Sequence, residues 1–131
     1  MSQVPDRARI RDDDGAAVVE FVLVGVLLCL LFLAVAQVGL ALYVRNTLVA
    51  CAAEGARYGA DADRNPDDGA AYARALISRA LSYRFARDVT AGYDVRTGAV
   101  EVQVRAAVPV VGLLGPPRTM VVRGHALEES R

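Results

Sequence analysis

The longest apolar stretch of the chain runs from Phe21 to Val44 and reads FVLVGVLLCLLFLAVAQVGLALYV. It carries no charge and only one amide, Gln37. As a helix it would rise about 36 Å, which is enough to cross the hydrocarbon core of a bilayer with some tilt. A buried helix of a soluble protein is seldom this long and uncharged. The pattern therefore predicts one membrane-spanning helix.

Helical patterning continues beyond this stretch. The segment 42–60 is rich in Ala and lacks Pro, so we expect the spanning helix to extend through it. Asn65 as a cap and Pro66 at the first helical position predict a second helix, from Pro66 to about Phe85. Its predicted core-facing residues recur at helical spacing: Ala73, Leu76, Ile77, Ala80 and Leu81.

From Val89 onward the apolar period changes to two. Alternation over residues 100–108, with Tyr93 and Val95 preceding a Thr97-Gly98 turn, predicts a β-hairpin.

The C-terminal part completes the predicted sheet. Pro109 marks a sheet edge or the end of a strand. Residues 112–117 are expected to form a loop, and residues 119–126 a third strand. The expected fold class is α+β, with a long N-terminal helix, a shorter helix and a small antiparallel sheet.

Composition and scattered polar residues argue against several functions. Fifteen arginines balance fifteen acidic residues, and the sequence has no basic stripe of the kind that binds nucleic acid. A nucleic-acid partner is therefore not expected. His125 is the only histidine, so we expect no catalytic set, no metal and no cofactor. The acid-rich segment 61–69 could begin a calcium loop at Asp61. Such a loop needs Gly at its sixth position and an acid at its twelfth, where this chain has Pro66 and Tyr72, so calcium is not expected.

The two cysteines, Cys29 and Cys51, would lie about 33 Å apart on one helix, which excludes a disulfide between them. Two interpretations stay open. Both are small apolar residues, or Cys51 forms a disulfide with another chain.

A charged leader ends at Gly15, and Ala16, Glu20 and Phe21 lead into the apolar stretch. This arrangement resembles the processing site of type IV pilins and pseudopilins, in which a membrane-embedded peptidase cuts after the Gly. Glycine beside the scissile bond leaves an extended peptide unobstructed. Cutting before Ala16 would create an α-amino group on the same helical face as Glu20, and the resemblance implies that Glu20 pairs with such an amine on a neighbouring subunit.

The longer segment from Gly15 to Ala60, with GAAVVEFVLV followed by ALYVRNTLVACAAEGARYGA, resembles the TadE-like family. The C-terminal residues 108–115, VPVVGLLG, also resemble the later part of that family. The resemblance implies a pilin-like fold and a minor pseudopilin of the tight-adherence (Flp/Tad) pilus system. Its implied partners are a prepilin-type peptidase, other pilin subunits, the Tad assembly platform and the lipid of the inner membrane.

We expect three parts: a leader over residues 1–15 that is cleaved, a spanning and extended helix over 16–60, and an extracytoplasmic α+β domain over 61–131. The larger C-terminal part and the leader arginines favour an N-terminus inside the cell. Small residues at spacings of three and four predict helix-packing positions: Gly25, Cys29, Ala36 and Gly39 in the span, and Gly55 and Gly59 beyond it.

Two alternatives remain at this point. Ala34-Val35-Ala36 has the form of a conventional signal-cleavage site, although the acidic leader argues against that class. The chain could also be an unprocessed single-pass envelope protein that binds another extracytoplasmic partner.

Overall fold

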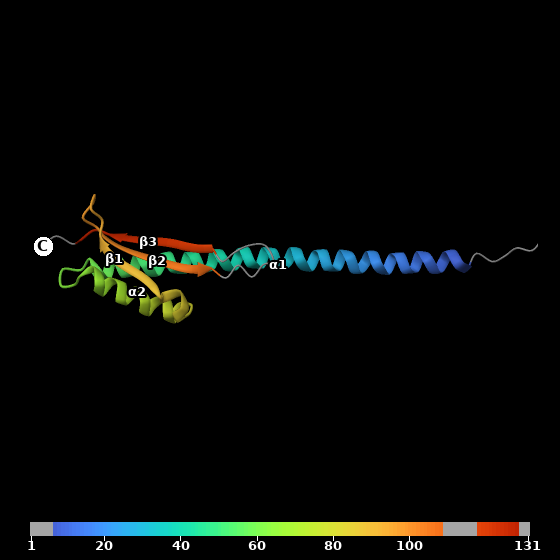
Figure 1. The fold of residues 1–131 in the computed structure, drawn as a ribbon, viewed down its shortest axis with the longest axis horizontal. Coiled ribbons are helices and arrows are strands. Elements are labelled where there is room, and N and C mark those ends of the chain that lie inside the picture. The colour runs from blue at the N-terminus through green and yellow to red at the C-terminus, as the bar shows by residue number, and fades with distance from the viewer. Residues whose placement is uncertain (1–6, 109–117, 129–131) are drawn as a thin grey trace, which may run out of the picture. The chain divides into compact units, whose positions relative to one another are not determined.

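The computed structural model describes residues 7–108 and 118–128. Two α-helices, α1 (Arg7–Gly59) and α2 (Pro66–Ala80), are followed by a short 3-10 helix, η1 (Tyr83–Ala86). Three strands complete the described chain: β1 (Asp88–Tyr93), β2 (Val100–Val108) and β3 (Arg118–Ala126). Figure 1 shows this order along the chain. The predicted α+β class is confirmed.

The strands form one antiparallel sheet in the order β1-β2-β3. The register places Val89 opposite Val104, and Val104 opposite Val122. Because side chains alternate between the two faces of a strand, these valines share one face. All three are buried, whereas Glu101 and Gln103 on the other face are only partly buried. The sheet thus has one core face and one outer face.

The core lies between the inner face of the sheet and the two helices. Helix α1 contributes residues from Val44 onward, including Leu48, which has no exposed surface. Helix α2 contributes Ile77, which is equally inaccessible. Arg74 of α2 also donates a hydrogen bond of 2.6 Å to the carbonyl oxygen of Val89, which ties α2 to β1. The C-terminal part of α1 is therefore a core helix of the α+β unit.

By its internal contacts the chain divides within α1, between Val38 and Gly39. The part from Gly39 onward is the folded unit, and residues 44–60 supply a substantial share of its buried side chains. A small domain gains a larger core by incorporating the end of a long helix.

Helix α2 starts as predicted. Asn65 is the N-cap, with extended backbone, and Pro66 stands in the first turn. The Asn65 side chain accepts a hydrogen bond from the Asp68 amide at 3.0 Å, and the Asp68 carboxylate accepts one from the Asn65 amide at 3.1 Å. These reciprocal bonds satisfy two amides at the helix start.

The end of α2 differs from the prediction of about Phe85. The helix stops at Ala80, Leu81 leaves helical geometry, and η1 follows. This early end lets Phe85 and Ala86 enter the core on the short connection to β1. Ala80 was expected in the core but is exposed, because it stands at the last position of the helix.

The hairpin is confirmed, with one correction at its turn. The Asp94 amide donates to the Ala99 carbonyl at 2.8 Å, so the chain reverses within residues 95–98. Val95 therefore lies in the turn, fully exposed, instead of in a strand. Gly98 has a φ of +69°, which explains a glycine at this position.

The third strand is confirmed and begins at Arg118, one residue earlier than expected. The predicted strand end at Pro109 and the loop over residues 112–117 lie outside the described residues.

Candidate functional site

The surface of α1 over residues 21–38 is uncharged and almost entirely apolar. Over Asp13–Gly59 the helix is long and apolar enough to cross a membrane, with a mean hydropathy of 3.0 in its most apolar window, none of which is buried. Phe21 is 79% exposed and Phe32 is 71% exposed. Exposure of so many large apolar side chains would be unfavourable in water. By length and composition, α1 is a candidate membrane span of a single-pass protein.

The residues of the expected processing site lie inside α1. The helix begins at Arg7 and passes through Gly15 and Ala16 without interruption. A Cβ at Gly15 would meet no other atom within 4 Å, so the glycine is not required by packing. Glu20 and Phe21 follow on the same helix, and both are exposed. Glu20 is one turn beyond Ala16, which gives the two residues a common helical face.

The expected packing residues fall into two structural groups. Gly25, Cys29, Ala36 and Gly39 are exposed, and a Cβ at either glycine would meet nothing within 4 Å. The described chain itself therefore leaves these four positions uncovered.

Gly55 and Gly59 are buried against α2. A Cβ at Gly55 would lie 2.7 Å from both the Ala73 Cβ and the Gly69 carbonyl oxygen. A Cβ at Gly59 would lie 3.2 Å from the Gly69 Cα. The lack of side chains lets α1 and α2 approach closely, and the partner of these two glycines is α2 of the same chain.

Cys51 lies in the core cluster and is only 8% exposed. It stands beyond the apolar span, in the folded unit, and burial raises the pKa of its thiol. Disulfide exchange requires an accessible thiolate. The interpretation of Cys51 as a small apolar residue fits this position, whereas a disulfide between chains through Cys51 does not. Cys29 is exposed on the apolar part of α1.

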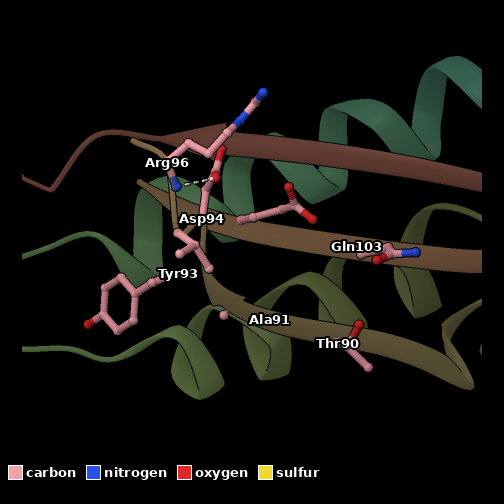
Figure 2. Close-up of a pocket in the computed structure, with 9 residues that line it drawn as sticks. Thr90, Ala91, Tyr93, Asp94, Arg96 and Gln103 are labelled. Carbon is pink, nitrogen blue, oxygen red and sulfur yellow. Dashed lines mark hydrogen bonds between the residues drawn. The ribbon is translucent and has the colours of Figure 1, made fainter. Parts of the chain in front are cut away.

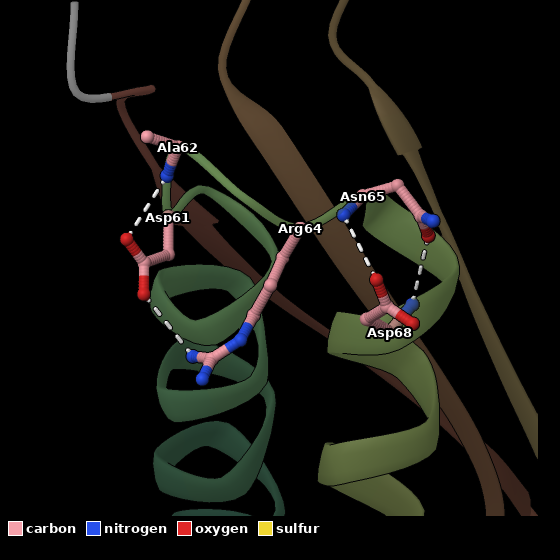
Figure 3. Close-up of polar contacts among 5 residues, drawn as sticks. All are labelled: Asp61, Ala62, Arg64, Asn65 and Asp68. Atoms are coloured by element: carbon pink, nitrogen blue, oxygen red, sulfur yellow. Dashed lines mark hydrogen bonds and ion pairs between the residues drawn. The ribbon is translucent and has the colours of Figure 1, made fainter. Parts of the chain in front are cut away.

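In the acid-rich connection between α1 and α2, the side chains bond to neighbouring residues of the same connection (Figure 3). Asp61 accepts a hydrogen bond from the Ala62 amide at 2.9 Å and pairs with Arg64 at 3.2 Å. Arg64 also lies over the Tyr58 ring, 3.6 Å from its centroid, and Tyr58 stacks on Tyr72 with 4.3 Å between ring centroids. These contacts connect the end of α1 with α2.

A groove lies on the outer side of the hairpin. Its lining comes from β1 and the following turn, including Thr90, Asp94 and Arg96, and from Glu101 and Gln103 of β2. Figure 2 shows the Asp94 carboxylate accepting a hydrogen bond from the Arg96 amide, at 2.9 Å. With the Thr97 side chain, this bond lowers the pKa of Asp94 below its ordinary value.

His125 is exposed on β3, and it is not isolated. It faces Glu101 across the β2–β3 register, with 3.5 Å between Nδ1 and Oε2. The sequence analysis missed this pairing. It also missed the close approach of Gly69 to Gly55 and of Gly124 to the Ala52 backbone. The period-two pattern could have placed His125 and Glu101 on one face, but the register was needed to set them opposite each other.

Residues 15–57 match the family described as TadE-like protein, which bears out the resemblance found in the sequence. The match begins at Gly15, covers the whole apolar stretch and ends at Arg57, so it includes Gly55 but not Gly59. No curated protein and no solved structure matches the chain.

Proposed function

We propose that this protein is a single-pass, pseudopilin-like membrane subunit that helps to assemble or anchor a Tad-type pilus or a related secretion apparatus. The observation that carries the proposal is the match of residues 15–57 to the TadE-like family. The exposed apolar surface of α1 over residues 21–38, which lies within the match, supports it. Membrane insertion and assembly would then use one continuous helical surface.

In this proposal a prepilin-type peptidase cuts between Gly15 and Ala16, and the mature chain starts with Ala16. Glu20 then lies one turn from the new amine and meets the amine of a neighbouring pilin or pseudopilin subunit. Gly25, Cys29, Ala36 and Gly39 are the positions at which neighbouring helices approach within the membrane. The folded unit lies outside the cytoplasmic membrane, and no nucleic acid or cofactor takes part.

Intact mass of the protein extracted from membranes tests this proposal. A chain beginning at Ala16 is expected, and replacement of Gly15 by Leu should leave the full-length chain. Gly25→Leu is the matched control, since Gly25 is also exposed on α1 with free space around its Cα. Normal processing of Gly15→Leu would contradict the proposed peptidase site. A chain beginning at Gln37 would show conventional signal cleavage.

The second candidate is an unprocessed single-pass envelope protein that binds another extracytoplasmic partner. The observation that favours it is the uninterrupted helix through Gly15, because cutting there would first require the peptide to unwind. A parent protein whose mass corresponds to a chain starting at Met1 would support this candidate.

A further inference from the structure

The outer face of the sheet brings together three side chains of the kinds that bind metal ions. Asp94 follows β1, Glu101 lies on β2, and His125 lies on β3 directly opposite Glu101. One ligand atom of each residue lies within 4.8 Å of those of the other two. We propose that Asp94, Glu101 and His125 form a binding site for a divalent transition-metal ion, with Zn²⁺ as the best-matched ion.

The distances agree with the size of a zinc site. Nitrogen and oxygen ligands lie about 2.0–2.2 Å from Zn²⁺, so two ligands in tetrahedral arrangement are separated by roughly 3.4 Å. His125 Nδ1 and Glu101 Oε2 are 3.5 Å apart, which is close to this separation. One carboxylate oxygen of Asp94 lies within 4.8 Å of a ligand atom of Glu101 and of a ligand atom of His125. A side-chain adjustment of about 1 Å would complete three protein ligands, with water in the remaining position.

Neighbouring groups prepare the two carboxylates for this role. The Arg96 amide holds one oxygen of Asp94 at 2.9 Å. Arg123 Nε lies 3.6 Å from Oε1 of Glu101, so Oε2 is the oxygen that faces His125. Partners that orient the ligands are a regular part of metal sites.

The donor set selects the class of ion. One imidazole nitrogen and two carboxylate oxygens suit Zn²⁺ and similar transition metals, whereas Ca²⁺ and Mg²⁺ favour sites made only of oxygen. The Glu101 and His125 side chains are 28% and 49% exposed, which leaves a path for the ion. A bound ion would link the β1–β2 turn to β3 and so stabilise the sheet. This site is independent of the proposed role in pilus assembly.

Calorimetric titration of the full chain with Zn²⁺, in detergent micelles and without a histidine tag, tests the proposal. We expect one Zn²⁺ per chain, with an affinity that falls at least tenfold in His125→Gln, Glu101→Gln and Asp94→Asn. Asp88→Asn is the matched control, since Asp88 begins β1 on the same outer face and is not among the three ligands. Ca²⁺ should bind far more weakly than Zn²⁺.

Two further measurements detect Zn²⁺ binding without calorimetry. His125 is the only histidine, so NMR signals from isotope-labelled histidine report this ring alone and should shift on addition of one equivalent of Zn²⁺. At a hundredfold excess over the parental Kd, Zn²⁺ should also raise the Tm of the parent by about 10 °C and that of His125→Gln by about half as much or less.

Three results would overturn the proposal. The first is the absence of saturable one-to-one binding by the parent. The second is parental affinity in all three ligand variants. The third is an equal loss in Asp88→Asn, which would indicate attraction to a negative surface without a defined site.

Discussion

Gly124 on β3 lies directly against the backbone of Ala52 in α1. A Cβ at position 124 would overlap the carbonyl group of Ala52 and the amide of Ala53, closer than side chains approach in real structures. Both Gly124 and Ala52 are buried. This contact sets how closely the sheet packs on the C-terminal part of α1.

Replacement of Gly124 by Ala should destabilise the folded unit. Overpacking a tight core costs about 1–3 kcal/mol, and each kcal/mol lowers the Tm of a domain of this size by roughly 4–8 °C. Thermal unfolding in mild detergent, followed by circular dichroism, measures the effect. Gly92→Ala is the matched control, because a Cβ there meets nothing within 4 Å. Equal Tm values for the two variants would show that β3 can shift away from α1 without cost.

Cys51 should resist thiol reagents in the folded protein. The residue is buried and burial raises the pKa of its thiol, so little reactive thiolate is available near neutral pH. A water-soluble maleimide should label Cys51 slowly in the folded Cys29→Ser variant and fully after denaturation. Rapid labelling, or a Cys51-dependent dimer on non-reducing gels, would restore the interpretation of a disulfide between chains.

Glu20→Gln should be processed and inserted normally but should fail to crosslink with its assembly partners. Removing one partner of an ion pair costs about 3–5 kcal/mol where the pair is buried between subunits, and about 1 kcal/mol or less where water reaches it. The scissile bond precedes Glu20, so cutting should be unaffected. Glu54→Gln is the control on the same helix, since Glu54 pairs only weakly, at 3.5 Å, with exposed Arg57. Crosslinking of Glu20→Gln at the parental level would make Glu20 an ordinary surface acid.

The orientation of the chain is a separate prediction. Protease added outside spheroplasts should digest an epitope placed at the C-terminus, beyond β3, and spare one placed before Gly15. The reasons are the single candidate span within residues 7–108 and 118–128 and the arginines of the leader. Protection of the C-terminal epitope in intact spheroplasts, with its loss only after lysis, would reverse the proposed topology.

Features with a local cause could be predicted from the sequence. The start of α2 depends on Asn65 and Pro66, which act within a single helical turn, and it was placed correctly. The buried side of β2 follows from strict alternation and was also correct. The end of α2 was misplaced by five residues, because its early end depends on how Phe85 packs against distant parts of the core.

In the candidate site, too, some features could be predicted from the sequence and others needed the tertiary structure. The apolar span could be predicted from the sequence, since its signal is a run of adjacent residues. The processing site from Gly15 to Phe21 has the same kind of signal and stays a prediction. The partner of Gly55 and Gly59 was not, because an Ala- and Gly-rich surface suits any close neighbour. The structure shows that α2 is that neighbour.

By itself, the sequence determined that this chain has one helix suited to a membrane, because transfer into lipid depends on the summed apolar character of consecutive residues. It also determined the order and type of the elements, through their periods. Only the tertiary structure decided that the Ala52 backbone packs directly against Gly124, and that Asp94, Glu101 and His125 lie close together on one face of the sheet. Such meetings depend on strand register and on close packing between segments far apart in the chain, and no local pattern encodes either.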